Sequence, residues 1–207
     1  MLLLRPLTRA IDWTPVGVAI LVTAAAAALI RSGSPAGLHA TDALVVLRMS
    51  ALLLGSAAGF FLVDPMTDST AAEPIPRWLR QWIRTALAIA TSAVAWTCVY
   101  AITSSRLGPT ASLPTAGLVL EAAVCVSTGL ACTAFAVRHR TERSAGLAGG
   151  AALLALFVVT LFFQDDLSNM SPWPMPNNPH WDSVHLIWLM VSPLPVIALT
   201  VANRDLR

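Results

Sequence analysis

The sequence of 207 residues contains no lysine, because all thirteen of its basic residues are arginine, and only 12% of its residues are charged. Without lysine it cannot hold a phosphate-binding loop of the G-x-x-x-x-G-K-[ST] type. The metalloprotease pattern H-E-x-x-H and the nucleophile pattern G-x-S-x-G are absent as well. We therefore predict no catalytic residues and no enzyme that acts alone.

Cysteines and clusters of basic residues are also scarce. Cys98, Cys125 and Cys132 fall inside apolar stretches, at spacings that match no zinc or redox motif, so we interpret them as small buried apolar residues. The arginines are scattered over short connections without interleaved aromatic residues that could stack on bases. Nucleic acid is therefore not an expected partner.

Apolar residues, by contrast, make up 56% of the chain. Stretches of about 20 apolar residues, enough for a helix to cross a hydrocarbon core of roughly 30 Å, recur along the whole length. Backbone polar groups in lipid must be satisfied within their own segment, which favours a helical bundle. We predict an all-α integral membrane protein with a single transmembrane domain over 1–207, whose six transmembrane helices cover 14–30, 43–63, 85–103, 115–137, 145–163 and 184–202.

The arginines are divided unevenly between the two sets of connections. If the N-terminus is inside, the outer connections hold only Arg31 and Arg106, whereas the inner ones hold Arg5, Arg9, Arg77, Arg80, Arg84, Arg138, Arg140, Arg143, Arg204 and Arg207. Cytoplasmic connections carry an excess of positive residues. Both termini are therefore predicted to lie inside.

Small residues and prolines in the spans bear on how the helices pack. The stretches "GSAAG" (55–59) and "GLAGG" (146–150) place small residues four apart, which allows close helix contact either within the chain or between subunits. Pro193 and Pro195 remove two backbone donors and predict a kink in the sixth span.

Two charges fall inside predicted spans, where charges need partners. Arg48 lies six residues into the second span, counted from Asp42, and Glu121 lies six residues into the fourth, counted from Thr115. At 1.5 Å per residue both lie about 9 Å below the outer boundary. This equal depth predicts an ion pair that joins the second helix to the fourth, either as a packing element or as part of a substrate path.

The outer loop 164–183 is rich in proline and tryptophan and leads into the sixth span. Tryptophan favours the lipid headgroup region, so we predict an interfacial or re-entrant outer element formed by Trp173, His180, Trp181, His185 and Trp188. Met170 and Met175 together with the two histidines could suggest a copper site. The irregular spacing argues against it, and we predict no metal site.

The inner connector 64–84 divides at its prolines. Asp64 can cap a helix that begins at Pro65, and Pro74 and Pro76 cannot continue it, which predicts a short helix over 65–72. The stretch "RWLRQWIR" then predicts an interfacial helix that leads into the third span. The residues expected to form this interfacial helix are Arg77, Trp78, Arg80, Trp82 and Arg84.

In these features the chain resembles the permease subunits of type-2 ABC exporters, especially the small actinobacterial kind. The shared pattern is an arginine in the second span, an Asp-Pro connector that ends in Pro-x-Pro and arginine, an acid in the fourth span and a Trp- and Pro-rich outer loop. It covers nearly the whole chain, although Val63 stands where the pattern often has a further acid. The matching positions are Arg48, Asp64, Pro65, Pro74, Pro76, Arg77, Glu121, Trp173, Trp181, His185 and Trp188.

The resemblance implies that 65–72 is a cytoplasmic coupling helix, which docks onto a separate nucleotide-binding subunit that holds ATP and Mg. It also implies a second permease copy or a sister permease, no cofactor on this chain, export of a small or amphipathic molecule, and a place in the bacterial inner (cell) membrane. The alternative is a non-transporting scaffold or accessory subunit of a larger complex. The coupling residues would be Asp64, Pro65, Met66, Thr67, Asp68, Ser69 and Thr70.

Overall fold

A computed structural model describes residues 11–30, 37–63, 76–109, 111–139, 143–162 and 171–204. The predicted coupling helix, with its residues Asp64 to Thr70, lies outside this part of the chain. Within it the fold is all-helical, as predicted. The helices are α2 (Thr14–Leu29), α3 (Ala40–Ala58) with the 3-10 helix η1 (Gly59–Leu62), α5 (Arg77–Ser104), α6 (Thr115–His139), η2 (Arg143–Gly146), α7 (Leu147–Leu161), α8 (Trp181–Val191) and α9 (Pro193–Ala202).

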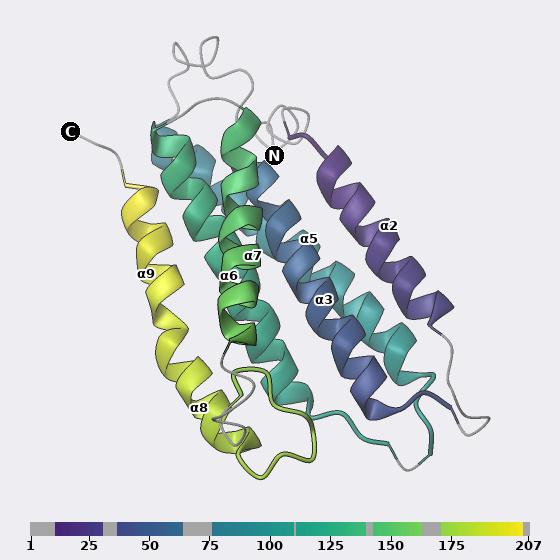
Figure 1. Ribbon diagram of the computed structural model, residues 1–207. Coiled ribbons are helices and arrows are strands. Elements are labelled where there is room, and N and C mark those ends of the chain that lie inside the picture. Colours follow the sequence, from purple (N-terminus) through teal and green to yellow (C-terminus); the bar gives the residue numbers. More distant parts are fainter. Residues whose placement is uncertain are drawn as a thin grey trace.

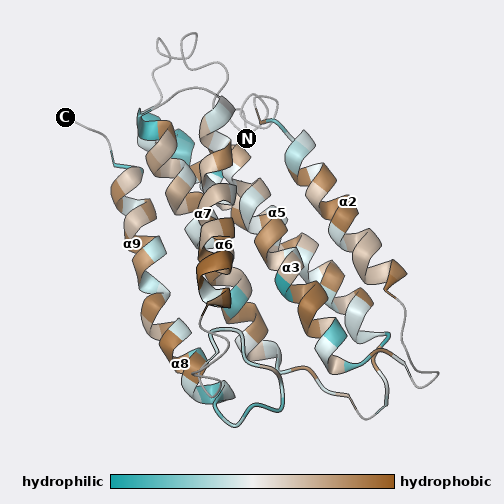
Figure 2. Ribbon diagram, viewed as in Figure 1, coloured by the Kyte–Doolittle hydropathy of each residue, from teal (hydrophilic) through white to brown (hydrophobic). Residues whose placement is uncertain are grey.

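Successive passes run antiparallel along one bundle (Figure 1). The start of α2 and the end of α9 lie at the same end, which we call the termini end, and α8 lies at the opposite end, which we call the α8 end. Hydrophobic residues predominate along the helices, and hydrophilic ones gather toward the ends and around the start of α8 (Figure 2).

Five passes are long and apolar enough to cross a membrane: Ala40–Leu62, Arg77–Ser104, Thr115–His139, Ser144–Leu161 and Trp181–Ala202. The first pass, α2, has 16 residues. At 1.5 Å per residue it is about 24 Å long, shorter than a hydrocarbon core of roughly 30 Å. It begins at Thr14, where Pro15 occupies the first turn, and it ends where Ile30 turns out of the helical conformation.

Helices α3 and α6 form the centre of the bundle, because they are the passes whose residues are most fully buried. Glycines bring their backbones together. A Cβ atom on Gly55 would lie 2.9 Å from the carbonyl oxygen of Cys125, and one on Gly129 would collide with the carbonyl oxygen of Gly55. A Cβ on Gly149 of α7 would lie 2.6 Å from the Gly129 carbonyl. The two predicted small-residue patterns thus pack helices within the chain.

The last pass is interrupted at the predicted prolines. Helix α8 ends at Val191 and α9 begins at Pro193, while Ser192 between them keeps helical dihedral angles. Pro193 cannot donate to the carbonyl of Leu189, four residues earlier. The Ser192 hydroxyl donates to that carbonyl instead, at 2.8 Å. The break in the backbone pattern is therefore compensated by a side chain.

The third pass differs from prediction. Instead of a separate interfacial helix followed by a span over 85–103, α5 is one continuous helix of 28 residues from Arg77. Trp78 is 45% exposed at its start, and Arg77 is exposed as well, but Arg84 is only 2% exposed. Although Arg77, Arg80 and Arg84 share a helix face, Arg84 lies two turns deeper and is covered by the neighbouring pass. It is therefore a buried residue and not an interfacial one.

Candidate functional site

The charged residues predicted to pair form a bidentate ion pair toward the α8 end. Arg48 Nε donates to Glu121 Oε2 and Arg48 Nη2 donates to Glu121 Oε1, each at 2.8 Å. The side chains are 10% and 1% exposed, respectively. A planar guanidinium matches both carboxylate oxygens at once, which is the strong form of this contact. The pair joins α3 to α6, the two central helices.

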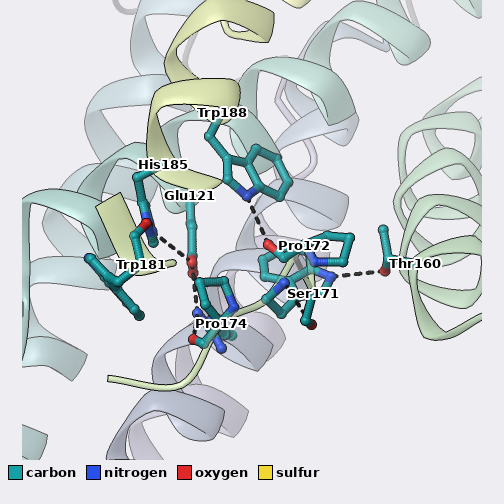
Figure 3. Close-up of polar contacts among 10 residues, drawn as sticks. Glu121, Thr160, Ser171, Pro172, Pro174, Trp181, His185 and Trp188 are labelled. Atoms are coloured by element: carbon teal, nitrogen blue, oxygen red, sulfur yellow. Dashed lines mark hydrogen bonds and ion pairs between the residues drawn. The ribbon is translucent and has the colours of Figure 1, made fainter. Parts of the chain in front are cut away.

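His185 of α8 is the third member of this group. Its Nε2 lies 3.1 Å from Glu121 Oε1, and its Nδ1 lies 2.8 Å from the backbone oxygen of Trp181 (Figure 3). The ring reaches Glu121 because Gly117, one turn earlier on α6, has no side chain. A Cβ there would lie 2.6 Å from His185 Nε2 and 2.8 Å from the Trp181 ring.

The 171–180 segment, which has turns but no helix, closes over this group. The carbonyl oxygen of Pro174 accepts a bond from Arg48 Nη2 at 2.8 Å, and that of Pro172 accepts one from Trp188 Nε1 at 2.9 Å. Trp173 Nε1 donates to the hydroxyl of Thr160 on α7 at 2.8 Å. The segment is thereby fixed to α3, α8 and α7 (Figure 3).

Indole rings surround the cationic side of the pair. The guanidinium carbon of Arg48 lies 5.6 Å from the Trp173 ring centroid and 5.9 Å from that of Trp181. Trp181 also stacks on the His185 ring, with centroids 4.2 Å apart, and Trp173 lies 5.1 Å from Trp188. Faces of aromatic rings attract cations, so these tryptophans stabilise positive charge here. We call Arg48, Glu121, His185 and the contacts just described the Glu121 network.

Residues before α8 explain why the helix presents Trp181 and His185 on one face. The side-chain oxygen of Asn178 accepts a bond from the His180 backbone N–H at 2.8 Å, which fixes a turn. Helix α8 then begins at Trp181, and residues four apart share a face. Of the five outer-element residues predicted from the sequence, Trp173, Trp181, His185 and Trp188 meet at the Glu121 network, whereas His180 bonds to Asn178 through its backbone N–H.

The copper hypothesis finds no support in the described residues, which contain no group of three or more His, Cys, Asp or Glu side chains close enough to hold a metal ion. Met170 lies outside the described residues, and Met175 is 46% exposed. His185, whose two ring nitrogens face Glu121 and the Trp181 carbonyl, is already engaged.

A second buried arginine lies at the termini end. Arg84 Nη1 donates to the carbonyl oxygen of Val63, directly after η1, at 3.1 Å. Carbonyl groups at a helix end are unsatisfied within the helix and carry partial negative charge, so a cation there is favourable. This contact ties α5 to the end of the α3–η1 pass.

A half-open groove of about 470 Å³ lies between α5 and α6, and residues of α3 and α9 also line it. Its walls are apolar apart from scattered hydroxyls, and none of the described residues that line it is charged. Such a surface suits hydrocarbon more than a polar solute. The hydroxyl-bearing residues are Ser92, Thr97, Ser127 and Ser192.

The fold and this site define an all-helical protein with the make-up of a multi-pass membrane protein, whose central helices are joined by a buried ion pair. Comparisons with models of known families, with curated proteins and with solved structures found no match for the chain.

Proposed function

We propose that the chain is the membrane-spanning permease subunit of an ABC exporter, which moves a small or amphipathic molecule outward. ATP would be hydrolysed with Mg on a separate nucleotide-binding subunit, and a second permease copy or a sister permease would complete the pathway. The chain would cross the bacterial cell membrane six times, with α2 as a short first span and with both termini inside.

One observation carries this proposal: six of the eleven residues that make up the resemblance, although far apart in sequence, meet in one network. Arg48 and Glu121 form the ion pair, while Trp173, Trp181, His185 and Trp188 enclose it. The convergence of these six positions supports the proposal.

Two further features agree with the proposal. Arg77, Arg80 and Arg138 begin or end passes at the termini end, and this agrees with a cytoplasmic location of that end. The apolar groove between α5 and α6, with its few hydroxyls, is compatible with a lipophilic or amphipathic cargo.

Co-purification tests the proposal directly. The chain is extracted from its native membrane in mild detergent, and the accompanying chains are identified by mass spectrometry. We expect an ATPase subunit, and we expect it to be lost when residues 65–72 are replaced by a Gly/Ser linker of equal length. A matched linker in place of residues 31–36, on the predicted outer side, serves as the control. Absence of an ATPase from the wild-type complex would contradict the proposal.

The alternative, an accessory subunit that moves nothing, is favoured by one observation: Glu121 is only 1% exposed and therefore does not line an open path. The variant Glu121→Gln separates the two functions, since it keeps the size of the side chain. Folded protein that retains its ATPase partner but transports nothing favours the permease. Folded protein with unchanged activity of its complex favours a purely structural role for the pair.

A further inference from the structure

The hydrogen bonds of His185 fix the number of protons in the Glu121 network. A backbone carbonyl oxygen only accepts hydrogen bonds, so the contact of 2.8 Å between His185 Nδ1 and the Trp181 oxygen requires a proton on Nδ1. A neutral imidazole carries a single N–H. If His185 is neutral, its Nε2 therefore has a lone pair and no proton.

That lone pair would face a carboxylate. Nε2 lies 3.1 Å from Glu121 Oε1, and the same carboxylate accepts two bonds from Arg48, as an ionised group does. Two acceptors at this distance repel each other unless a proton lies between them. Both contacts of His185 are hydrogen bonds at the same time only when each ring nitrogen carries a hydrogen, which is one proton more than an Arg48–Glu121 pair with a neutral histidine holds.

The surroundings of the site suit the extra positive charge. With that proton, the three side chains carry a net charge of +1, since arginine stays charged. The groups around them are electron-rich: the carbonyl oxygens of Pro174 and Trp181 accept bonds, and indole faces lie against both cationic groups. Trp181 contributes to both, because its ring stacks on His185 and lies 5.9 Å from the Arg48 guanidinium carbon.

We propose that Glu121 and His185 together bind one proton, and that this proton attaches α8 and the 171–180 segment to the α3–α6 pair. When the proton leaves Nε2 for water, Glu121 is a carboxylate and His185 changes from a cation to a neutral ring, whose remaining hydrogen stays on Nδ1 in the bond to the Trp181 carbonyl. The two acceptors then repel each other, and release of the α8 end becomes favourable. Opening of that end is thus linked to proton release.

Other titratable groups near His185 are few in the described part of the chain. Glu121 contacts it directly, Arg48 acts through Glu121, and Cys125 lies one turn further along α6, close to both charges. On α8 itself, Asp182 lies three residues before His185 and is exposed. The groups of α7 and of the 171–180 segment that contact the network are a hydroxyl, carbonyl oxygens and indole rings. Proton binding by Glu121 and His185 does not depend on an ATPase partner. It can therefore be absent in a protein that is an ABC permease, and it can be present in a protein that is not.

Nitrogen NMR of the full chain in lipid nanodiscs, with ¹⁵N-labelled histidine, tests the proton directly. The chain has four histidines, and the signals of His185 are those lost in His185→Gln. We expect both ring nitrogens of His185 to carry hydrogen at the acidic end of a pH series and Nε2 to lose its hydrogen at the alkaline end. In Glu121→Gln, whose neutral amide can itself donate to Nε2, we expect His185 to stay singly protonated at a pH where the wild type is doubly protonated. A wild-type His185 with hydrogen on Nε2 alone, or the same titration in both proteins, would overturn the proposal.

Thermal unfolding across the same pH series tests the attachment. A bound proton that holds the α8 end changes the ratio of attached to released forms by up to about tenfold per pH unit, favouring release as pH rises. We expect the unfolding midpoint of the wild type to fall with rising pH more steeply than that of His185→Gln. The other three histidines contribute equally to both proteins.

Trp188→Phe is the matched control, because it removes the bond to the Pro172 carbonyl without changing a titratable group. We expect it to lower the midpoint at every pH while keeping the wild-type slope. Equal slopes in the wild type and His185→Gln would show that the proton does not hold the α8 end.

Discussion

The α3–η1 pass has an arginine site toward each of its ends, formed by its own Arg48 and by Arg84 of α5, and the two sites differ in how far along the chain their partners lie. Toward the α8 end, Glu121 is 73 residues from Arg48 and 64 from His185. At the termini end, Arg84 reaches back only 21 residues to the Val63 carbonyl. The first site joins α3, α6, α8 and the 171–180 segment, whereas the second joins two consecutive passes. We therefore expect the first to control the whole fold and the second to act locally.

The largest effect is expected from Glu121→Ala. It leaves Arg48 buried without its anion, which costs about 3–5 kcal/mol in a buried pair. Equilibrium unfolding in detergent measures the loss. Asp182→Asn, on an exposed acid of α8, should stay within about 0.5 kcal/mol of the wild type.

A double variant sharpens this result. Replacing both members by apolar residues, Arg48→Met with Glu121→Leu, should recover much of the lost stability, because no buried charge is left without a partner. A double variant less stable than Glu121→Ala would show that the ion pair is not the main element at this end.

A smaller effect is expected at the other arginine. Arg84→Met keeps the apolar stem but removes the bond to the Val63 carbonyl, and hydrogen bonds to charged groups contribute about 1.5–3 kcal/mol. Unfolding measures the loss, and the NMR signals of His185 should stay unchanged. If those signals shift, the two ends are coupled and the contrast between them is wrong.

Between the two arginines, Gly55→Ala should cost about 1–3 kcal/mol, because the added methyl group would lie 2.9 Å from the Cys125 carbonyl and 3.0 Å from Leu153 Cδ1. Gly17→Ala on α2 is the matched control, since no atom of the described residues outside its own helix turn lies within 4 Å of its added Cβ. Helix propensity alone should make that control slightly more stable than the wild type. Equal losses for the two variants would contradict the close packing of α3 on α6.

The smallest effect is expected from the tryptophans. Trp188→Phe removes one hydrogen bond and keeps an aromatic ring, so we expect a loss of about 0.5–1.5 kcal/mol in the unfolding free energy. Trp78→Phe, 45% exposed at the termini end, should change almost nothing. A similar loss from both would mean that the 171–180 segment contributes little to the α8 end.

The sequence predicts the passes and the ion pair because both depend on quantities that are local along the chain. Apolar length sets the passes, and residue count from a helix start sets the depth at which Arg48 and Glu121 meet. The inner face of the bundle is harder to predict. Arg84 shares a helix face with Arg77 and Arg80, and only the packing of the neighbouring pass distinguishes it from them.

The closure of the 171–180 segment could not be predicted for a different reason. Its contacts use backbone carbonyls of Pro172 and Pro174, which every residue possesses, so no pattern of side chains marks them. The approach of His185 depends on a missing side chain at Gly117. A glycine one turn before a buried acid is a signal that could have indicated a third partner for Glu121.

The break at Ser192 has a mechanical consequence. Because Pro193 and Pro195 donate no backbone bonds, the junction of α8 and α9 has fewer backbone bonds than a continuous helix, and the Ser192 hydroxyl bond to Leu189 replaces one of them. Helix α8, 11 residues and so about 16 Å long, can then rotate about Ser192, and His185 lies near its middle, four residues from its free end at Trp181. A small rotation at Ser192 would move His185 and the start of α8 away from Glu121 while α9 keeps its place on α6.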